Sequence, residues 1–486
     1  MLFDNSYQNL PKEFYERINP TPVNDPRLII YNKGLASTIG IDKNISEFEL
    51  TKIFAGNNIP IGSSPIALAY AGHQFGNFVN QLGDGRAILL GEICAPNKQR
   101  YDIQLKGSGQ TKFSRQGDGR APIGPVIREY VVSEAMSALG IPTTRSLAIV
   151  ATGEKVFRET LIPGGILTRI AKSHIRVGTF EYFAAKGNNE HLKTLADYTI
   201  NRHFSELKEA SNPYSSLLRI VCNNQIELIS QWMGVGFIHG VMNTDNTTLI
   251  GETIDYGPCA FMDEYNPASV FSSIDANGRY AFGNQPLIGQ WNMACFANSL
   301  LPLIDKDLEK SLSKAQEIID NFPNRMNEAI MKIMCSKIGF KVSDKDSQEL
   351  LKNYLKLMLD NKSDYTLSFR YLSNLLKNTD INLLNEQFKD QESLTSWLKD
   401  WMNELKTKKI NKKDAIKVMD EKNPIFIPRN HFLERTIEKA IKDNDYSEMQ
   451  TLLEVLAKPF EEQPNYSTYI DPPNEDEVVQ QTFCGT

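Results

Sequence analysis

The spacing of apolar residues changes near Thr179, and this change constrains the fold more than any other feature of the sequence. Before it, the chain is rich in glycine and carries four short runs that are typical of strands: 87–90, 103–106, 147–150 and 165–168. Within the same part, apolar residues at helical spacing predict a helix over 125–139. After Thr179, helical spacing dominates. The sequence therefore predicts an α+β fold with a β-rich first part and a larger, mainly helical second part.

The length of 486 residues is too great for one ordinary hydrophobic core, so we expect two packed lobes and a tail. Residues 1–172 would form an N-terminal lobe with an N-terminal extension and glycine-rich nucleotide-binding elements. Residues 173–463 would form a helical C-terminal lobe that carries catalytic and metal-binding loops. Residues 464–486, rich in proline, asparagine and acidic residues, would form an extended tail that carries Cys484.

Charge and hydropathy exclude several classes of protein. A formal net charge of -6 speaks against a nucleic-acid-binding protein. No segment approaches the roughly 18 apolar residues of a membrane span. The first residues lack the features of a signal or transit peptide, so we expect a cytoplasmic protein. The sequence does not determine the oligomeric state, and a monomer is our working expectation.

The six cysteines include no CxxC pair, which speaks against a zinc site, and most are expected to be small buried residues. Helical spacing of Leu394, Trp397, Leu398, Trp401, Met402 and Leu405 predicts a core stripe in preference to a cofactor box. The six lysines of 406–417 are interpreted as a solvated helix face or connector in preference to a phosphate-binding patch.

Two glycine-rich segments of the first part could bind a nucleotide. Gly83 and Gly85 precede Arg86 and a strand, and glycines let backbone amides approach phosphate oxygens. A tight turn between strands is the alternative, and it is the preferred interpretation of this segment taken alone. A second glycine-flanked turn at 117–120 contains Asp118 and Gly119, which could contact phosphate or ribose or form a polar loop.

Lys106 ends an apolar strand about 20 residues after the first of these turns. In protein kinases, a lysine on the third strand pairs with ATP phosphates and with a glutamate of the next helix. The helix predicted here offers Glu129 and Glu134 for that role. An exposed lysine at a strand end is the competing interpretation. Arg169 and Arg176 could likewise make bidentate phosphate contacts or form salt bridges between the lobes.

The segment 239–258 is the most specific chemical feature of the sequence. Asp245, Asn246 and Asp255 lie within eleven residues, separated by the short apolar run 248–250. We expect a β-hairpin that directs both oxygen-bearing loops to one point. Asn246 and Asp255 suit a hard cation such as Mg²⁺, which leaves Asp245 as a proton acceptor. A capped loop with local hydrogen bonds is the alternative.

Three histidines, His73, His174 and His239, are interpreted as structural, with His239 bracing the loop that contains Asp245.

Taken together, these motifs resemble the selenoprotein O family of atypical kinases, over nearly the whole chain. The resemblance rests on ten segments: 70–76 (YAGHQFG), 81–86 (QLGDGR), 105–109 (LKGSG), 117–120 (GDGR), 231–233 (QWM), 239–246 (HGVMNTDN), 255–258 (DYGP), 278–280 (GRY), 427–431 (IPRNH) and 483–486 (FCGT). It implies a protein-kinase-like fold that holds ATP in a flipped orientation and transfers AMP to Ser, Thr or Tyr hydroxyls of proteins.

The resemblance also implies roles for individual residues. The nucleotide contacts would be Gly83, Gly85, Arg86, Lys106, Asp118, Gly119, Arg169 and Arg176. Glu129 would be the helix partner of Lys106. Asn246 and Asp255 would bind Mg²⁺ or Mn²⁺, and Asp245 would accept the proton. UTP as a donor of UMP, with manganese, stays open as a further reaction.

Members of the family often carry selenocysteine near the C-terminus, at the position that Cys484 matches here. That end can be tied to a cysteine in the loop after the metal-binding aspartate. The 269–275 part of that loop has no cysteine, so Cys259 is the candidate partner. Two alternatives stay open: an ATP-dependent kinase for proteins or small molecules, and a non-catalytic nucleotide-binding scaffold that senses redox state.

Overall fold

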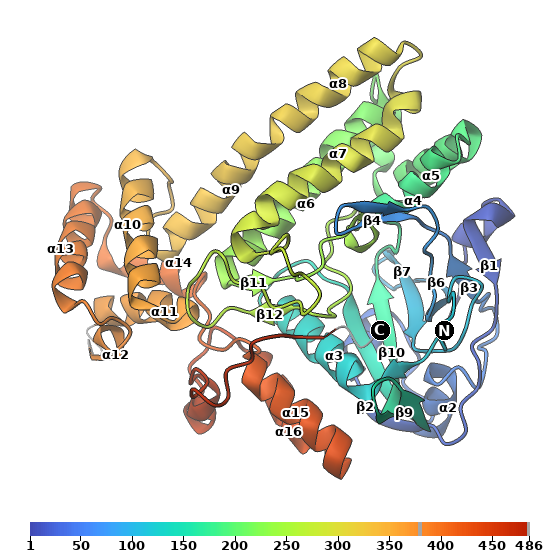
Figure 1. The fold of residues 1–486 in the computed structure, drawn as a ribbon, viewed down its shortest axis with the longest axis horizontal. Coiled ribbons are helices and arrows are strands. Elements are labelled where there is room, and N and C mark those ends of the chain that lie inside the picture. The colour runs from blue at the N-terminus through green and yellow to red at the C-terminus, as the bar shows by residue number, and fades with distance from the viewer. Residues whose placement is uncertain (378–381, 484–486) are drawn as a thin grey trace.

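One large sheet organises the first part of the chain in this computed structural model, which describes residues 1–377 and 382–483 (Figure 1). The strands are β1 (Tyr15–Arg17), β2 (Arg27–Tyr31), β3 (Ile66–Leu68), β4 (Gly72–Gln74), β5 (Asn77–Val79), β6 (Ala87–Cys94), β7 (Arg100–Lys106), β8 (Ala121–Pro122), β9 (Arg145–Phe157), β10 (Leu161–Ala171), β11 (Phe237–Ile238) and β12 (Ala260–Phe261). The sheet has the order β1-β3-β6-β7-β10-β9-β2, β8 pairs with β10, and neighbouring strands are antiparallel. The four expected strand segments lie inside β6, β7, β9 and β10, so this prediction is confirmed.

The helices are α1 (Lys33–Thr38), α2 (Glu47–Phe54), α3 (Ile123–Ala138), α4 (Val177–Ala185), α5 (Asn189–His203), α6 (Pro213–Val235), α7 (Gln285–Ile304), α8 (Leu308–Asp320), α9 (Phe322–Lys337), α10 (Lys345–Asn361), α11 (Tyr365–Leu376), α12 (Asn382–Asn385), α13 (Gln391–Thr407), α14 (Lys412–Asp420), α15 (Asn430–Asp443) and α16 (Ser447–Leu456). Most of them follow Thr179, and together with the sheet they make a mixed α and β protein, as expected.

Helices cover both faces of the sheet. Its central strands therefore contain continuous apolar runs. Helix α3 packs on β9 and β10, while α2 packs on β2, β9 and β10. Along β9, Ile149 joins the core beside α3, whereas Leu147 and Val150 join the core beside α1 and α2. A strand that is buried on both faces needs apolar residues at successive positions.

The remaining helices form a long bundle and a separate distal group. Helices α6, α7, α8 and α9 pack against one another, and Figure 1 shows them as a bundle that leads from the sheet to α10–α14. In α13 the predicted stripe is mostly correct, because Leu394, Trp397, Trp401 and Leu405 are buried. Leu398 is only partly buried, and Met402 is 49% exposed.

The sequence also predicts the exposure of the lysines of 406–417 and of the cysteines. The lysines of 406–417 lie at the end of α13, in the connector and along α14, where Lys417 is in the last turn, as expected. Cys222, Cys259 and Cys335 are buried. Cys295 is partly exposed, and Cys94, the last residue of β6, is exposed, so three of the five described cysteines are buried.

The last helices return to the sheet-bearing part. Helices α15 and α16 pack on α3, and an ion pair joins Arg128 of α3 to Glu434 of α15 (Figure 1). The backbone of Gly124 lies so close to α15 that a Cβ there would be 2.9 Å from Ile437. The limits given above for the lobes stay predictions.

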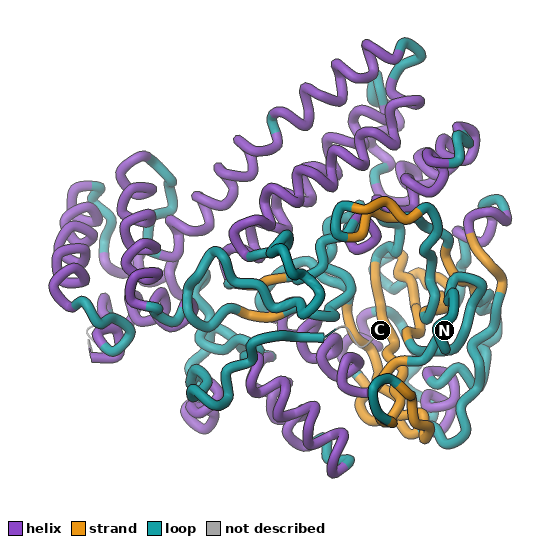
Figure 2. The backbone as a smooth tube through the Cα atoms, viewed as in Figure 1, coloured by secondary structure: helices purple, strands orange, loops and turns teal. Residues whose placement is uncertain are grey.

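A long irregular segment, 239–284, lies between the sheet and the distal helices (Figure 2). It begins directly after β11 and contains β12, which pairs with β11. The hairpin expected around 248–250 is wrong: Thr248 makes a single bridge with Arg176, and the next two residues form a turn. The Thr248 hydroxyl donates to the Glu252 carbonyl at 2.6 Å and accepts from the Glu252 amide at 2.9 Å, which closes a tight loop in place of a ladder.

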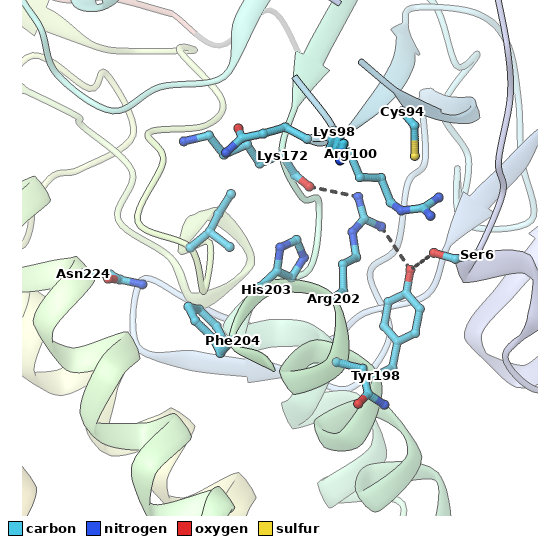
Figure 3. Close-up of a pocket in the computed structure, with 13 residues that line it drawn as sticks. Ser6, Cys94, Lys98, Arg100, Lys172, Tyr198, Arg202, His203, Phe204 and Asn224 are labelled. Atoms are coloured by element: carbon cyan, nitrogen blue, oxygen red, sulfur yellow. Dashed lines mark hydrogen bonds between the residues drawn. The ribbon is translucent and has the colours of Figure 1, made fainter. Parts of the chain in front are cut away.

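A buried ion network ties the sheet to α5. Arg202 of α5 pairs with Asp102 of β7 at 2.5 Å and with Glu92 of β6 at 3.1 Å. Figure 3 shows Arg202 also bonding the Tyr198 hydroxyl and the Lys172 carbonyl. Lys172, Tyr198 and Arg202 line a cavity of about 680 Å³. Its two arginines, Arg100 and Arg202, are already paired with carboxylates. No helix of the described residues is long and apolar enough to cross a membrane.

Candidate active site

Four charged side chains meet at the end of strand β7, and they come from β7, β10, α3 and the loop that contains Asp255. Lys106, at the end of β7, donates to Glu129 of α3 at 2.7 Å and also bonds Asp255. Arg169 of β10 donates to Glu129 at 2.8 Å and reaches Asp255 at 3.3 Å. Two cations and two carboxylates therefore form one cluster. Of the two glutamates that the sequence offered as helix partners of Lys106, Glu129 belongs to it, whereas Glu134 pairs with Arg145.

The cluster keeps its carboxylates ionised. Burial would raise the pKa of Asp255, but Lys106 and Arg169 outweigh it and hold that pKa well below the ordinary value. For Glu129, too, burial is outweighed by Arg169 and Lys106, so its pKa is lowered. Asp255 adopts a left-handed φ of 70°, an unusual conformation for a residue other than glycine or asparagine. Strained backbone of this kind is concentrated at functional sites.

Asp245 lies in a short 3₁₀ turn, Thr244–Asn246, and is 8% exposed. Burial raises the pKa of Asp245 to about 7. Its Oδ1 atom has no hydrogen-bond partner among the described residues, and its Oδ2 accepts from Gln74 at 3.3 Å. A buried carboxylate with an uncommitted oxygen is suited to accept a proton from an incoming hydroxyl.

The hairpin β4–β5 is clamped onto the loop that carries Asp245. The amide of His73 donates to the Thr244 hydroxyl at 2.7 Å, and the amide of Phe75 donates to Asn243 at 3.1 Å. The backbone of Gly72 lies so close that a Cβ there would be 2.6 Å from Asp245 Oδ1. Gly72 lies in the motif 70–76, but its contact with Asp245 has no signal in the sequence.

From its other side, the same loop is braced by His239. Its Nε2 bonds the Ile254 carbonyl at 2.9 Å, and its Nδ1 accepts from the Val241 amide at 3.3 Å. The predicted structural role of His239 is therefore confirmed. Ile254 is the residue before Asp255, so this histidine joins the two oxygen-bearing loops.

Asn246 and Asp255 supply the oxygen donors that a hard cation prefers. The Asn246 side-chain nitrogen donates to the Val241 carbonyl at 3.1 Å, which leaves its oxygen available as an acceptor. Asp255 offers an ionised carboxylate that is 29% exposed. The donor set therefore fits Mg²⁺ or Mn²⁺.

A chain of buried polar contacts links the two aspartates. Arg176 donates to the Asp245 carbonyl at 3.2 Å and lies 3.7 Å from Asp84. Asp84 accepts from Gln104 at 3.1 Å, and Gln104 in turn accepts from Arg169 at 3.2 Å. Arg169 completes the chain at Asp255. Asp84 and Gln104 had no sequence signal beyond their places in a glycine-rich turn and a strand.

The turn that holds Asp84 is covered by another loop. Gly83 has a φ of 88°, and a Cβ on it would be 2.4 Å from the ring of Phe113. A Cβ on Gly85 would be 2.9 Å from the Phe113 carbonyl. Both glycines are therefore required by close backbone approach. Arg86 follows directly, and its positive charge helps to lower the pKa of Asp255.

Asp118 and Gly119 stand apart from this cluster. Asp118 accepts from Arg158 at 2.9 Å and from the Arg120 amide at 2.9 Å. The Gly119 carbonyl accepts from the Gly109 amide at 3.0 Å, which joins the two glycine-flanked loops. The described contacts place neither residue against Lys106 or Asp255, and their nucleotide-binding role stays a prediction.

The redox prediction involves one described residue. Cys259 is buried, with 1% exposure, and follows the Asp255 loop. Cys484 lies outside the described residues. The nearby tail residue Thr482 donates its hydroxyl to the Pro258 carbonyl at 2.8 Å, so the tail reaches the segment that contains Cys259.

Comparison with known proteins gives one consistent family. The sequence profile of a family described as "Protein adenylyltransferase SelO" matches residues 1–457. The chain is 54% identical over 486 residues to "Protein nucleotidyltransferase YdiU" of Maridesulfovibrio salexigens, covering 100% of this chain and 98% of the relative. Proteins of the same name from Rhizobium etli and Bradyrhizobium diazoefficiens are 52% and 51% identical over 485 residues, covering 97% and 99% of those chains.

Proposed function

The chain belongs to the SelO family of protein adenylyltransferases, and we propose that it transfers AMP from ATP to Ser, Thr or Tyr hydroxyls of proteins. The observation that carries the proposal is the pairing of two sites: an Asp255 cluster rich in cations, and a nearby Asp245 with an uncommitted carboxylate oxygen. The cations of the Asp255 cluster would bind the phosphates of ATP. Asp245 would accept the proton of the acceptor hydroxyl.

The proposed architecture is a protein-kinase-like pair of lobes with the nucleotide between them. The order of a β-rich part and a helical part supports it, as do the Lys106–Glu129 bond and the two oxygen-bearing loops. These are the parts that position phosphates and metal in kinases.

In the proposed reaction, the hydroxyl oxygen of the acceptor attacks the α-phosphorus of ATP. The bond from that phosphorus to the bridging oxygen breaks, and pyrophosphate leaves. Asp245 Oδ1 accepts the hydroxyl proton. Lys106, Arg169 and Arg86 hold the charge of the phosphates, and Glu129 keeps Lys106 in place.

A divalent ion held by Asn246 and Asp255 would neutralise phosphate charge and align the α-phosphate. The ammonium group of Lys106 now bonds Asp255 directly. When Asp255 binds the ion, Lys106 would bind a phosphate oxygen in its place. Gly83, Gly85, Arg176, Asp118 and Gly119 complete the proposed nucleotide site. UTP as a second donor, with Mn²⁺, is part of the same proposal.

The competing kinase reaction would use the same residues with the γ-phosphate next to Asp245. The decisive experiment supplies purified protein with Mg²⁺ or Mn²⁺ and ATP that is labelled at either the α- or the γ-phosphate. We expect transfer of the α-label to protein hydroxyls. Transfer of the γ-label alone would replace the proposed function with a kinase, and transfer of neither label after reduction of disulfides would favour a nucleotide-binding scaffold.

Two variants make the experiment specific for this site. Asp255→Asn removes a charge from the cluster with almost no change of shape, and we expect it to abolish transfer. Asp400→Asn removes a charge from an exposed position on α13 and should leave transfer unchanged. Full activity of Asp255→Asn would contradict the assignment of the site.

A further inference from the structure

Three side chains with different ligand atoms meet beside the hairpin β4–β5. His73 lies on β4, Glu181 on α4 and Cys295 on α7. Their ligand atoms all lie within 4.8 Å of one another. All three line one cavity of about 550 Å³, which gives a solvent ion access to them. We propose that these residues form a binding site for a divalent transition metal of the Zn²⁺ type, separate from the pair Asn246 and Asp255.

The donor set selects the kind of metal. An imidazole nitrogen, a thiolate sulfur and a carboxylate oxygen are the three ligand types that bind Zn²⁺. Thiolate favours Zn²⁺ and similar transition metals over Mg²⁺, which prefers oxygen ligands alone. Asn246 and Asp255 offer only oxygen. The two sites would therefore bind different ions from the same solution.

The geometry requires only small movements of side chains. In a tetrahedral zinc site, bond lengths of about 2.0–2.3 Å place neighbouring ligand atoms roughly 3.3–3.6 Å apart. His73 Nδ1 and Glu181 Oε1 are now 2.5 Å apart and would move apart by about 1 Å, and no two of the ligand atoms are more than 4.8 Å apart. The cavity leaves the fourth position to water, as in zinc sites with three protein ligands.

Surrounding residues already hold the ligands in place. The Thr244 hydroxyl donates to the second oxygen of Glu181. The His73 ring is packed between Phe78 and Trp291, with ring centroids 4.9 and 5.0 Å away. Outer contacts of this kind orient metal ligands in proteins.

Cys295 is the ligand that changes most on binding. No hydrogen bond of its thiol is found among the described residues, and burial raises its pKa to about 12, so it is protonated without a metal. Binding forms a metal–sulfur bond and releases the thiol proton to solvent. No oxidant or reductant is needed.

A metal bound at this site would restrain the hairpin β4–β5, because the ligands lie on and beside it. His73 lies on β4 directly after Gly72, whose backbone lies against Asp245. Glu181 accepts a hydrogen bond from the hydroxyl of Thr244, the residue before Asp245. A metal would fix β4 to α4 and α7. Occupancy would therefore restrain the hairpin that covers the proposed base.

Co²⁺ is the probe of choice, because cobalt bound to thiolate gives a near-ultraviolet charge-transfer band and tetrahedral cobalt gives visible bands. The starting protein carries Cys94→Ser and Cys484→Ser, which removes an exposed thiol and the terminal one. We expect it to bind one equivalent of Co²⁺ with both spectral features, and Zn²⁺ should displace the cobalt. Neither readout depends on adenylyl transfer.

The ligand variants then decide the assignment. Cys295→Ser should lose the charge-transfer band, and His73→Ala should weaken Co²⁺ binding at least about tenfold. A crystal of the unsubstituted protein soaked in Zn²⁺ should show anomalous density between the three side chains, which covers the case of a variant that fails to fold. A starting protein with no thiolate band, or a band that survives in Cys295→Ser, would overturn the proposal.

Discussion

Replacing Gly72 with alanine should slow adenylyl transfer about 100-fold while the protein stays folded. Gly72 has no left-handed φ, so alanine can adopt its backbone conformation. The added Cβ would lie 2.6 Å from Asp245 Oδ1 and 3.0 Å from Asp245 Cβ. The effect of this substitution is therefore steric and is directed at one side chain.

The size of the effect follows from the overlap. Ordinary contact of a Cβ begins at 3.4 Å, so the carboxylate or the hairpin must move by about 0.8 Å. A displacement of about 1 Å of a reacting group can cost about 100-fold in rate. We expect the loss in kcat, and we expect the KM for ATP to change less than about twofold because the Asp255 cluster is untouched. Overpacking costs about 1–3 kcal/mol, well within the stability of a typical protein.

The assay is transfer of α-labelled AMP to protein under single-turnover conditions, together with thermal unfolding. Gly34→Ala is the matched control, because a Cβ at Gly34 in α1 meets nothing closer than Asn32 at 3.6 Å. If Gly72→Ala is folded and retains more than about half of the normal kcat, Asp245 is not constrained by the hairpin in the way that the geometry requires.

Two further predictions concern stability and the C-terminal tail. Burial lowers the pKa of Lys337 to about 7, so between its ordinary pKa of 10.5 and pH 7 the unfolded chain binds a proton that the folded protein does not. Stability should therefore fall by roughly 1.4 kcal/mol per unit as pH drops through that window and level off below it, and urea unfolding of Lys337→Met should lack this contribution. Thr482→Val removes the hydroxyl bond to the Pro258 carbonyl and should cost about 1–2 kcal/mol locally, so amide exchange across 258–272 should become about tenfold faster. Exchange unchanged there would mean that the backbone bond from Thr482 to Phe271 is sufficient to hold the tail.

The strands and long helices could be predicted because their signals are local. The runs at 87–90 and 147–150 are apolar at every position, and the stripe of Leu394, Trp397 and Trp401 follows one helix face. The expected strand at 248–250 failed for a reason that is also physical. The two apolar residues Leu249 and Ile250 do not define a strand when the hydroxyl of Thr248 can close the loop onto Glu252.

In the candidate site, too, some residues could be predicted from the sequence and others could not. Lys106, Glu129 and Asp255 could be predicted because charged residues next to apolar runs need partners. Asp84 and Gln104 could not, because a buried polar side chain in a strand looks like any other polar residue until its partner is known. Their bonds to each other and to Arg176 and Arg169 join segments that are far apart in the chain.

The position of Asp245 depends on such distant contacts more than on its own sequence. Gly72 limits one side of its carboxylate, Gln74 bonds one oxygen, and Arg176 bonds its carbonyl. Burial raises the pKa of Asp245 to about 7, and the hairpin contributes to this burial through Gly72 and Gln74. The hairpin β4–β5 is therefore part of the proposed active site in two ways: it sets where the base lies and how readily that base accepts a proton.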